Sequence, residues 1–197
     1  MKSSTPYCGV TLPLLRRTCK ALFAGTTFAN RQEWRRRILE LWRGARFREE
    51  RYAAIMLTGA KCAAAFQIPQ EMPVYEEIIV SGAWWDFVDE VATGRVGPIL
   101  QAYPAPMKML VWSRSDNLWK RRTSILCQLR FKQDTDLDLL YACIEPSLGS
   151  NEFFLRKAIG WALREYAWTD PVAVRKYVRG HKERLSGLSR REALKNI

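Results

Sequence analysis

Histidine is almost absent from this chain, which has only His181 among its 197 residues. A site that needs two histidine ligands, or a histidine pair for proton transfer, is therefore excluded. The five cysteines form no C-x-x-C pair, so we expect reduced thiols rather than zinc ligands or disulfides. Nucleophile–base motifs and phosphate-binding glycine loops are missing too, so we predict no metal and no cofactor. The cysteines are Cys8, Cys19, Cys62, Cys127 and Cys143.

Glycine and proline are also scarce, at 11 and 9 residues, which is too few for a turn-dense all-β sandwich. No stretch reaches the ~18 uninterrupted apolar residues of a membrane-spanning helix. The apolar stretch 10–15 is broken by Pro13 and followed by Arg16 and Arg17, which argues against a signal peptide. We therefore predict a soluble, intracellular, mostly helical protein.

Acidic residues are outnumbered, with 20 Asp and Glu against 32 Lys and Arg, so the net charge is +12. A chain this basic, with a pI near 9.8, favours a polyanionic partner, first nucleic acid and second an acidic membrane surface. Hydrophobic residues make up 48% of the chain, too many for a disordered polymer. The length suits one domain with a sizeable core.

Segments with helical periodicity are separated by short stretches that contain glycine, proline or serine. Local signals predict where several of these helices begin and end. Asn30 and Glu33 form a capping-box pattern, and Gly44 suits the end of the helix that follows. Thr169 is the N-cap expected before Pro171. A faint repeat relates Arg51, Arg122 and Lys157, which are 71 (122 − 51) and 35 (157 − 122) residues apart. A period near 35 predicts stacked helix pairs in a solenoid.

The segment 151–168 is the clearest amphipathic helix. One face carries the apolar stripe that packs into a core. Another face carries Lys157, Trp161, Arg164 and Trp168, and such interleaved cations and indoles can contact phosphates, sugars and bases. The alternative is a half-buried face in which lysine and arginine stems cover the rings. The stripe is Leu155, Ile159, Ala162, Leu163 and Tyr166.

The string Trp84-Trp-Asp-Phe-Val-Asp89 begins another short helix. Trp85 and Asp89 are i and i+4, so the ring and the carboxylate are neighbours on one face. That pair could stabilise a cation that develops on a ligand. The alternative is an acid favoured by the helix dipole, with a tryptophan packed nearby.

Arg122 shares a helical face with Leu118, Ile125 and Leu129, and a guanidinium in such a place needs a partner. The partner could be a carboxylate, helix C-terminal carbonyls or a phosphate. Any catalysis in this chain must rest on a carboxylate, aromatic rings and positioned cations.

These segments resemble, in order along nearly the whole chain, the HEAT-like-repeat alkylpurine DNA glycosylases, the AlkD-type DNA alkylation repair family. The resemblance is carried by Pro6-Tyr-Cys-Gly-Val-Thr-Leu-Pro-Leu-Leu-Arg16, Trp84-Trp-Asp-Phe-Val-Asp89, Asn117-Leu-Trp-Lys-Arg-Arg122, Glu152-Phe-Phe-Leu-Arg-Lys-Ala-Ile-Gly-Trp-Ala-Leu-Arg-Glu-Tyr166 and Leu188-Ser-Arg-Arg-Glu-Ala-Leu-Lys195.

The resemblance implies an all-α solenoid of HEAT-like repeats with a concave basic face for DNA. It implies that Asp89 is the catalytic carboxylate, with Trp85 and Trp161 as the flanking rings. It further implies that Arg122 contacts DNA beside the lesion. We add Lys157, Arg164 and Arg121 as DNA-binding residues. Family members usually carry a further N-terminal helix, and Gly9 lies eight residues after Met1, so we expect that helix to be missing from a single domain over 1–197.

The hypothesis is a monofunctional DNA glycosylase that removes cationic N3- or N7-alkylated purines from duplex DNA and so initiates base excision repair. We expect a monomer in a bacterial-type cytoplasm, associated with the nucleoid when it is bound to DNA, with no membrane partner. The first alternative is a non-catalytic paralogue that binds damaged or branched DNA. The second is a HEAT-type scaffold for an acidic protein.

Overall fold

The computed structural model describes residues 5–197, and within that range the chain is 71% helix with no strand. The predicted all-α class is confirmed, and the succession of helices is consistent with a helical repeat solenoid. Packing divides the chain into two compact units, Met1–Arg95 (unit 1) and Val96–Ile197 (unit 2). The single domain expected over 1–197 stays a prediction.

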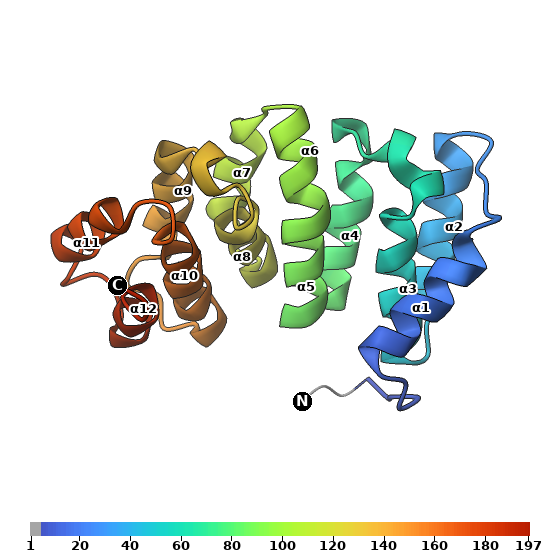
Figure 1. The fold of residues 1–197 in the computed structure, drawn as a ribbon, viewed down its shortest axis with the longest axis horizontal. Helices are drawn as coiled ribbons and strands as arrows, with labels where there is room; N and C mark the ends of the chain where they lie inside the picture. Colours follow the sequence, from blue (N-terminus) through green and yellow to red (C-terminus); the bar gives the residue numbers. More distant parts are fainter. Residues whose placement is uncertain (1–4) are drawn as a thin grey trace. The chain divides into compact units, whose positions relative to one another are not determined.

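In unit 1, α2 lies beside α3 and α4 lies beside α5 (Figure 1). The predicted cap of α2 is confirmed, because the Asn30 side chain accepts the backbone N–H of Glu33 at 2.9 Å and Gly44 is the last helical residue. The helices are α1 (Leu12–Phe23), α2 (Arg31–Gly44), α3 (Arg48–Thr58), α4 (Met72–Gly82) and α5 (Trp85–Val91), with 3-10 turns at Lys61–Phe66 and Pro69–Glu71 and a π-helical turn at Ala92–Val96.

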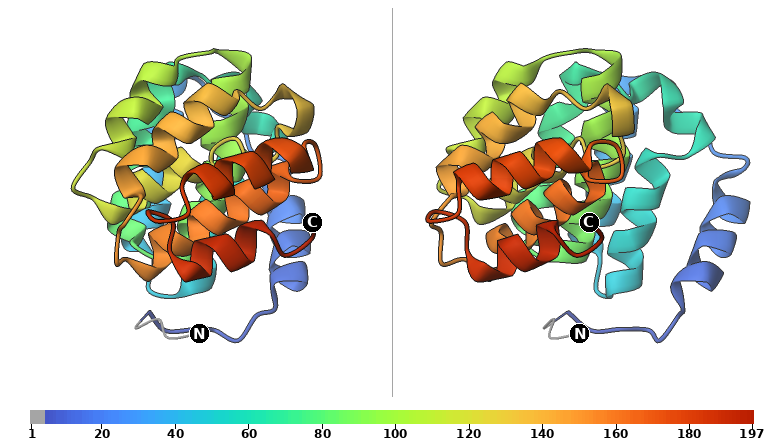
Figure 2. Two further views of the ribbon diagram at one scale, coloured as in Figure 1. Left: turned by 90° about the vertical axis from the view of Figure 1, so that its left-hand side faces the viewer. Right: turned by 60° about the vertical axis from the view of Figure 1, so that its left-hand side comes forward.

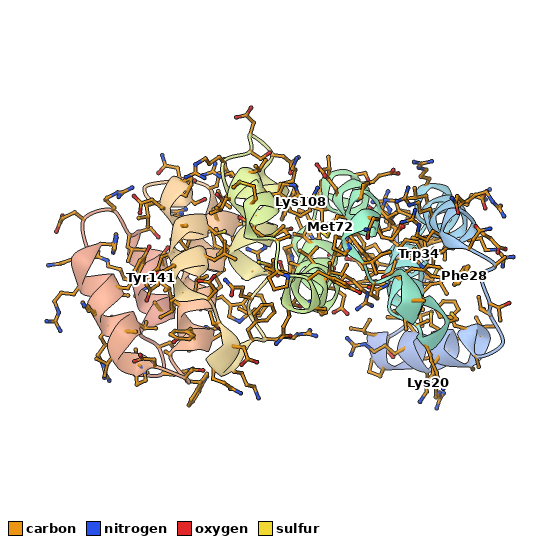
Figure 3. All side chains as sticks on the ribbon, turned by 90° about the horizontal axis from the view of Figure 1, so that it is seen from above. Lys20, Phe28, Trp34, Met72, Lys108 and Tyr141 are labelled. Carbon is orange, nitrogen blue, oxygen red and sulfur yellow. The ribbon has the colours of Figure 1, made fainter. Side chains whose placement is uncertain are left out.

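The core of unit 1 is rich in aromatic rings. Trp34 stacks on Phe66 with 5.7 Å between ring centroids, and Phe28 meets Phe66 edge-on at 6.0 Å; Trp34 and Phe28 are labelled in Figure 3. Trp42 packs edge-on against Phe87 of α5 at 5.6 Å. Phe87 and its neighbour Val88 are fully buried. Their packing in the core fixes the orientation of α5 and therefore the directions in which its other side chains point.

The segment before α1 is tied to α3 by one carboxylate. Glu49 accepts the backbone N–H groups of Cys8, Gly9 and Val10 at 3.0, 3.0 and 3.2 Å. Gly9 has a φ of +80°, a left-handed conformation that favours glycine. The Gly-Val block of the sequence therefore has a structural role in wrapping the chain start onto α3.

Unit 2 ends in three helices that lie side by side, α10, α11 and α12 (Figure 2). The N-cap of α11 is Asp170, whose side chain accepts the Ala173 N–H at 2.8 Å; the expectation of Thr169 was wrong by one residue, and Pro171 opens the helix as predicted. The helices are α6 (Gly97–Ala102), α7 (Pro106–Ser113), α8 (Leu118–Leu126), α9 (Leu137–Ile144), α10 (Phe153–Tyr166), α11 (Pro171–Gly180) and α12 (Gly187–Ala193), with 3-10 turns at Lys132–Asp134 and Glu145–Ser147.

Helix α10 packs at the centre of unit 2 through the predicted stripe, of which four members are buried and Tyr166 is half-buried. Its contact with α12 depends on Gly160. A Cβ at this position would lie 2.5 Å from the Glu192 Cβ and 2.9 Å from the Ser189 carbonyl oxygen. Ser189 also donates its hydroxyl to the Arg156 carbonyl at 2.9 Å. The close approach of α12 thus needs a residue without a side chain on α10.

No helix in the described part of the chain combines the length and apolar character that crossing a bilayer requires.

Candidate functional site

Helix α5 of unit 1 presents an exposed ring and a buried carboxylate one turn apart. Trp85 is the first residue of α5 and is 37% exposed, whereas Asp89 is 8% exposed. The Asp89 carbonyl accepts the Thr93 hydroxyl at 2.9 Å, which continues the helix past this residue. A helical spacing of four places both side chains on the same side of α5. Both residues thus belong to one helix, as the sequence predicted, and their assignment to a site stays a prediction.

The other acid of the same string, Asp86, belongs to the core of unit 1. It forms an ion pair with Arg48, whose side chain is only 1% exposed, and accepts a hydrogen bond from the Tyr52 hydroxyl. The Arg48 guanidinium also lies 4.4 Å from the centre of the Phe87 ring. Burial and the hydrogen bond to Asp86 raise the pKa of Tyr52. Asp86 therefore has a structural role in the core, for which the sequence analysis made no prediction.

The remaining predicted site residues lie in unit 2. Arg122 on α8 is buried, its Nη1 donates to the Phe154 carbonyl at the start of α10, and its guanidinium lies 5.9 Å from the Phe154 ring centre. The sequence left a carboxylate, helix C-terminal carbonyls or a phosphate open as partners, whereas the Phe154 carbonyl lies in the first turn of α10.

Arg121 is half-buried and bonded to the turn after α9. Its Nη2 donates to the Pro146 carbonyl at 3.0 Å and to the Ser147 hydroxyl at 3.1 Å. The side chain therefore fastens α8 to that turn, and its assignment to DNA binding stays a prediction.

The cationic stripe of α10 has an acidic partner from α12. Lys157 Nζ lies 2.6 Å from Glu192 Oε1, and Arg164 Nη1 pairs with Glu192 Oε2. Glu192 is 15% exposed, and its hydrogen bond with Lys157 lowers the pKa of its carboxyl group despite the opposing effect of burial. Trp161, on the same face between the two cations, is half-buried, while Trp168 is 70% exposed. One carboxylate thus holds both cations that flank Trp161.

Sequence reading missed Glu192, although a signal was present. Within the block Leu188–Lys195 it is the one acid among three cations, Arg190, Arg191 and Lys195. A lone acid in a basic stretch suggests a defined ion pair, but its partners are 28 and 35 residues away in sequence.

A cavity of about 440 Å³ lies in unit 2 at the C-terminal end of α10. The residues that line it include Ile125, Leu129, Glu165, Tyr166 and Trp168. None of the seven predicted site residues lines it. Trp168 of the cationic stripe lines the cavity, whereas the residues predicted as catalytic or DNA-binding lie outside it.

Residues that commonly bind metals do not gather in the described range 5–197, where no group of three or more His, Cys, Asp or Glu side chains could hold an ion. His181 stacks on Tyr177 with 4.1 Å between ring centroids, and its Nδ1 lies 2.9 Å from the Tyr177 carbonyl oxygen. The one histidine thus has a structural place at the end of α11.

Comparison with known proteins identifies the family to which this chain belongs. A family model described as DNA alkylation repair enzyme matches residues 1–197. Among solved structures, a predicted DNA alkylation repair enzyme from Enterococcus faecalis is similar, with a TM-score of 0.83 and 26% sequence identity over 97% of this chain and 88% of that chain. A search of curated proteins found no match.

Proposed function

This chain belongs to the family of DNA alkylation repair enzymes, and we propose that it is a DNA glycosylase for N3- or N7-alkylated purines in duplex DNA. The observation that carries the proposal is the pair on α5, a buried Asp89 one helical turn after an exposed Trp85. A buried carboxylate next to an indole face is suited to a cationic centre.

The reaction requires little from the protein at the leaving group. An N3- or N7-alkylated purine carries a positive charge and departs as a neutral base, so no general acid is needed. Positive charge then moves to the deoxyribose, where Asp89 stabilises the oxocarbenium-like sugar and orients the attacking water. Trp85 and Trp161 each add cation–π stabilisation of roughly 0.5–2 kcal/mol. No lysine nucleophile takes part, so strand cleavage is not expected.

On this proposal, duplex DNA is held by Arg122, Arg121, Lys157 and Arg164, in a protein of net charge +12. Arg121, Arg122 and Arg164 already donate to protein groups, and Lys157 is ion-paired, so their positions are set before DNA arrives. Preorganised donors lose less conformational freedom on binding than free side chains do. On this proposal the protein is a monomer that initiates base excision repair where the chromosome lies, in a bacterial-type cytoplasm.

The decisive experiment is single-turnover release of 7-methylguanine from methylated duplex DNA by wild type and Asp89→Asn. We expect a loss of about 10²–10³-fold, as for removal of one electrostatic contact to a transition state. Duplex binding should be unchanged or slightly tighter, because a negative charge has been removed. The matched control is Glu90→Gln, the adjacent acid on α5, which should keep wild-type activity.

A second substrate tests the charge requirement. Hypoxanthine leaves as an anion unless it is protonated, and His181 is engaged with Tyr177, so its release should be slow or undetectable. Equal rates for hypoxanthine and 7-methylguanine would reject the mechanism. Tight duplex binding without release of any base by wild type would instead fit the non-catalytic DNA-binding protein.

A further inference from the structure

Two blocks of the sequence meet in unit 2 at a contact that the proposed reaction does not use. Gly160 of α10 lets α12 approach closely, and Ser189 of α12 is bonded to the Arg156 carbonyl at 2.9 Å. This docking places Glu192, one turn after Ser189, against the cationic face of α10. The position of the Glu192 carboxylate is therefore set by backbone contacts on both helices rather than by the ion pairs alone.

The carboxylate serves two cations at once. Glu192 Oε1 meets Lys157 Nζ at 2.6 Å, and Oε2 meets Arg164 Nη1. Helical spacing puts Lys157 one turn before Trp161 and Arg164 one turn after it. Glu192 is mostly buried, whereas Lys157 is 39% exposed and Arg164 is 22% exposed. The cations thus keep access to an outside anion while their stems are held.

We propose that Glu192 is a positioning residue that holds Lys157 and Arg164 on either side of Trp161. Its negative charge weakens the attraction of the two cations for DNA, but it fixes where they place the phosphate backbone. The inference rests on the proposed function, since it concerns the same ring and the same DNA. With Glu192 the three side chains carry a net charge of +1, and without its charge they carry +2. Free cations attract phosphates more strongly but at variable positions.

The consequence is a split between affinity and rate. Each further phosphate neutralised steepens the dependence of log K on log salt by about 0.9. Loose placement of the sugar beside the catalytic group slows the reaction, because small misplacements strongly reduce rates. A residue needed only for folding would not produce tighter binding together with slower release.

The test compares Glu192→Gln with Glu145→Gln, a matched control that removes one charge and breaks one ion pair, with Arg184, in the same unit. Duplex binding is measured between about 50 and 200 mM salt, and 7-methylguanine release under single-turnover conditions with saturating protein. For Glu192→Gln we expect about three- to tenfold tighter binding at low salt, a slope steeper by about 0.9, and release about tenfold slower. Glu192→Asp should restore part of the rate.

Weaker binding by Glu192→Gln, or binding and rates equal to those of Glu145→Gln, would overturn the inference while leaving an active wild type in support of the proposed function. If wild type releases no base, the proposed function fails, and the binding and salt-slope measurements still decide whether Glu192 restrains the two cations. A fall in melting temperature with unchanged binding per folded molecule would assign Glu192 to stability alone.

Discussion

Replacing Gly160 with alanine tests the contact that seats α12 on α10. The new Cβ would lie 2.5 Å from the Glu192 Cβ, 2.9 Å from the Ser189 carbonyl oxygen and 3.2 Å from the Ser189 Cα. Two of these atoms are backbone and the third is fixed to it, so no side-chain rotation relieves the clash. Helix α12 must move away, and its hydrogen bond from Ser189 to Arg156 is weakened with it.

Two opposing effects set the magnitude. Alanine in a helix interior is favoured over glycine by roughly 0.5–1 kcal/mol. Overpacking of a filled contact costs about 1–3 kcal/mol, and backbone atoms place this case in the upper half of that range. The clash therefore outweighs the gain, and we expect a net loss of about 1–2.5 kcal/mol in the free energy of unfolding. At roughly 2–4 °C per kcal/mol for a chain of this size, the melting temperature should fall by about 2–10 °C.

The assay is thermal and urea unfolding followed by circular dichroism, with Gly180→Ala as control. Gly180 is the last residue of α11, and a Cβ there would meet nothing within 4 Å. The control should stay within about 0.5 kcal/mol of wild type. A Gly160→Ala protein as stable as wild type, or more stable, would refute the close-approach account, because propensity alone would then explain glycine-to-alanine changes on this helix.

Two further predictions concern the start of the chain and the buried arginine. Burial alone would raise the pKa of Glu49, but hydrogen bonds from the N–H groups of Cys8, Val10 and Gly9 together lower the pKa by more than burial raises it. The folded pKa of Glu49 therefore lies below the unfolded value of about 4.3. Its stabilising effect is complete above that value and is lost as pH falls through the folded pKa. Amide exchange protection at those three residues should therefore be kept at neutral pH and lost in acid, and protection that persists in acid, or in Glu49→Gln at neutral pH, would contradict this. Arg122→Ala should lower the free energy of unfolding by about 1–3 kcal/mol, because the Phe154 carbonyl loses its donor, and should weaken duplex binding as well. An unchanged melting temperature together with weaker binding would mean that the guanidinium contributes to DNA binding and not to stability.

The pattern of the sequence determined the helical class, the amphipathic face of α10 and the cap of α2, because each depends on residues within a turn or two of one another. Trp85 and Asp89 could be paired from spacing alone for the same reason. The N-cap of α11 was placed one residue too early, since Thr169 and Asp170 are both suitable caps and only the backbone conformation at Asp170 distinguishes them.

Tertiary packing decided what each charge does. Asp86 and Asp89 are three residues apart in the sequence. Asp86 accepts hydrogen bonds from Arg48 and Tyr52, which lie on a helix more than thirty residues earlier. The sequence predicts Lys157 and Arg164 only as DNA-binding cations on one face of a helix. In the structure both form ion pairs with Glu192 of α12, and the close packing of α12 on α10 depends on Gly160 having no side chain. Local spacing records which side chains share a face, whereas the partner of a buried charge comes from whichever helix packs against that face.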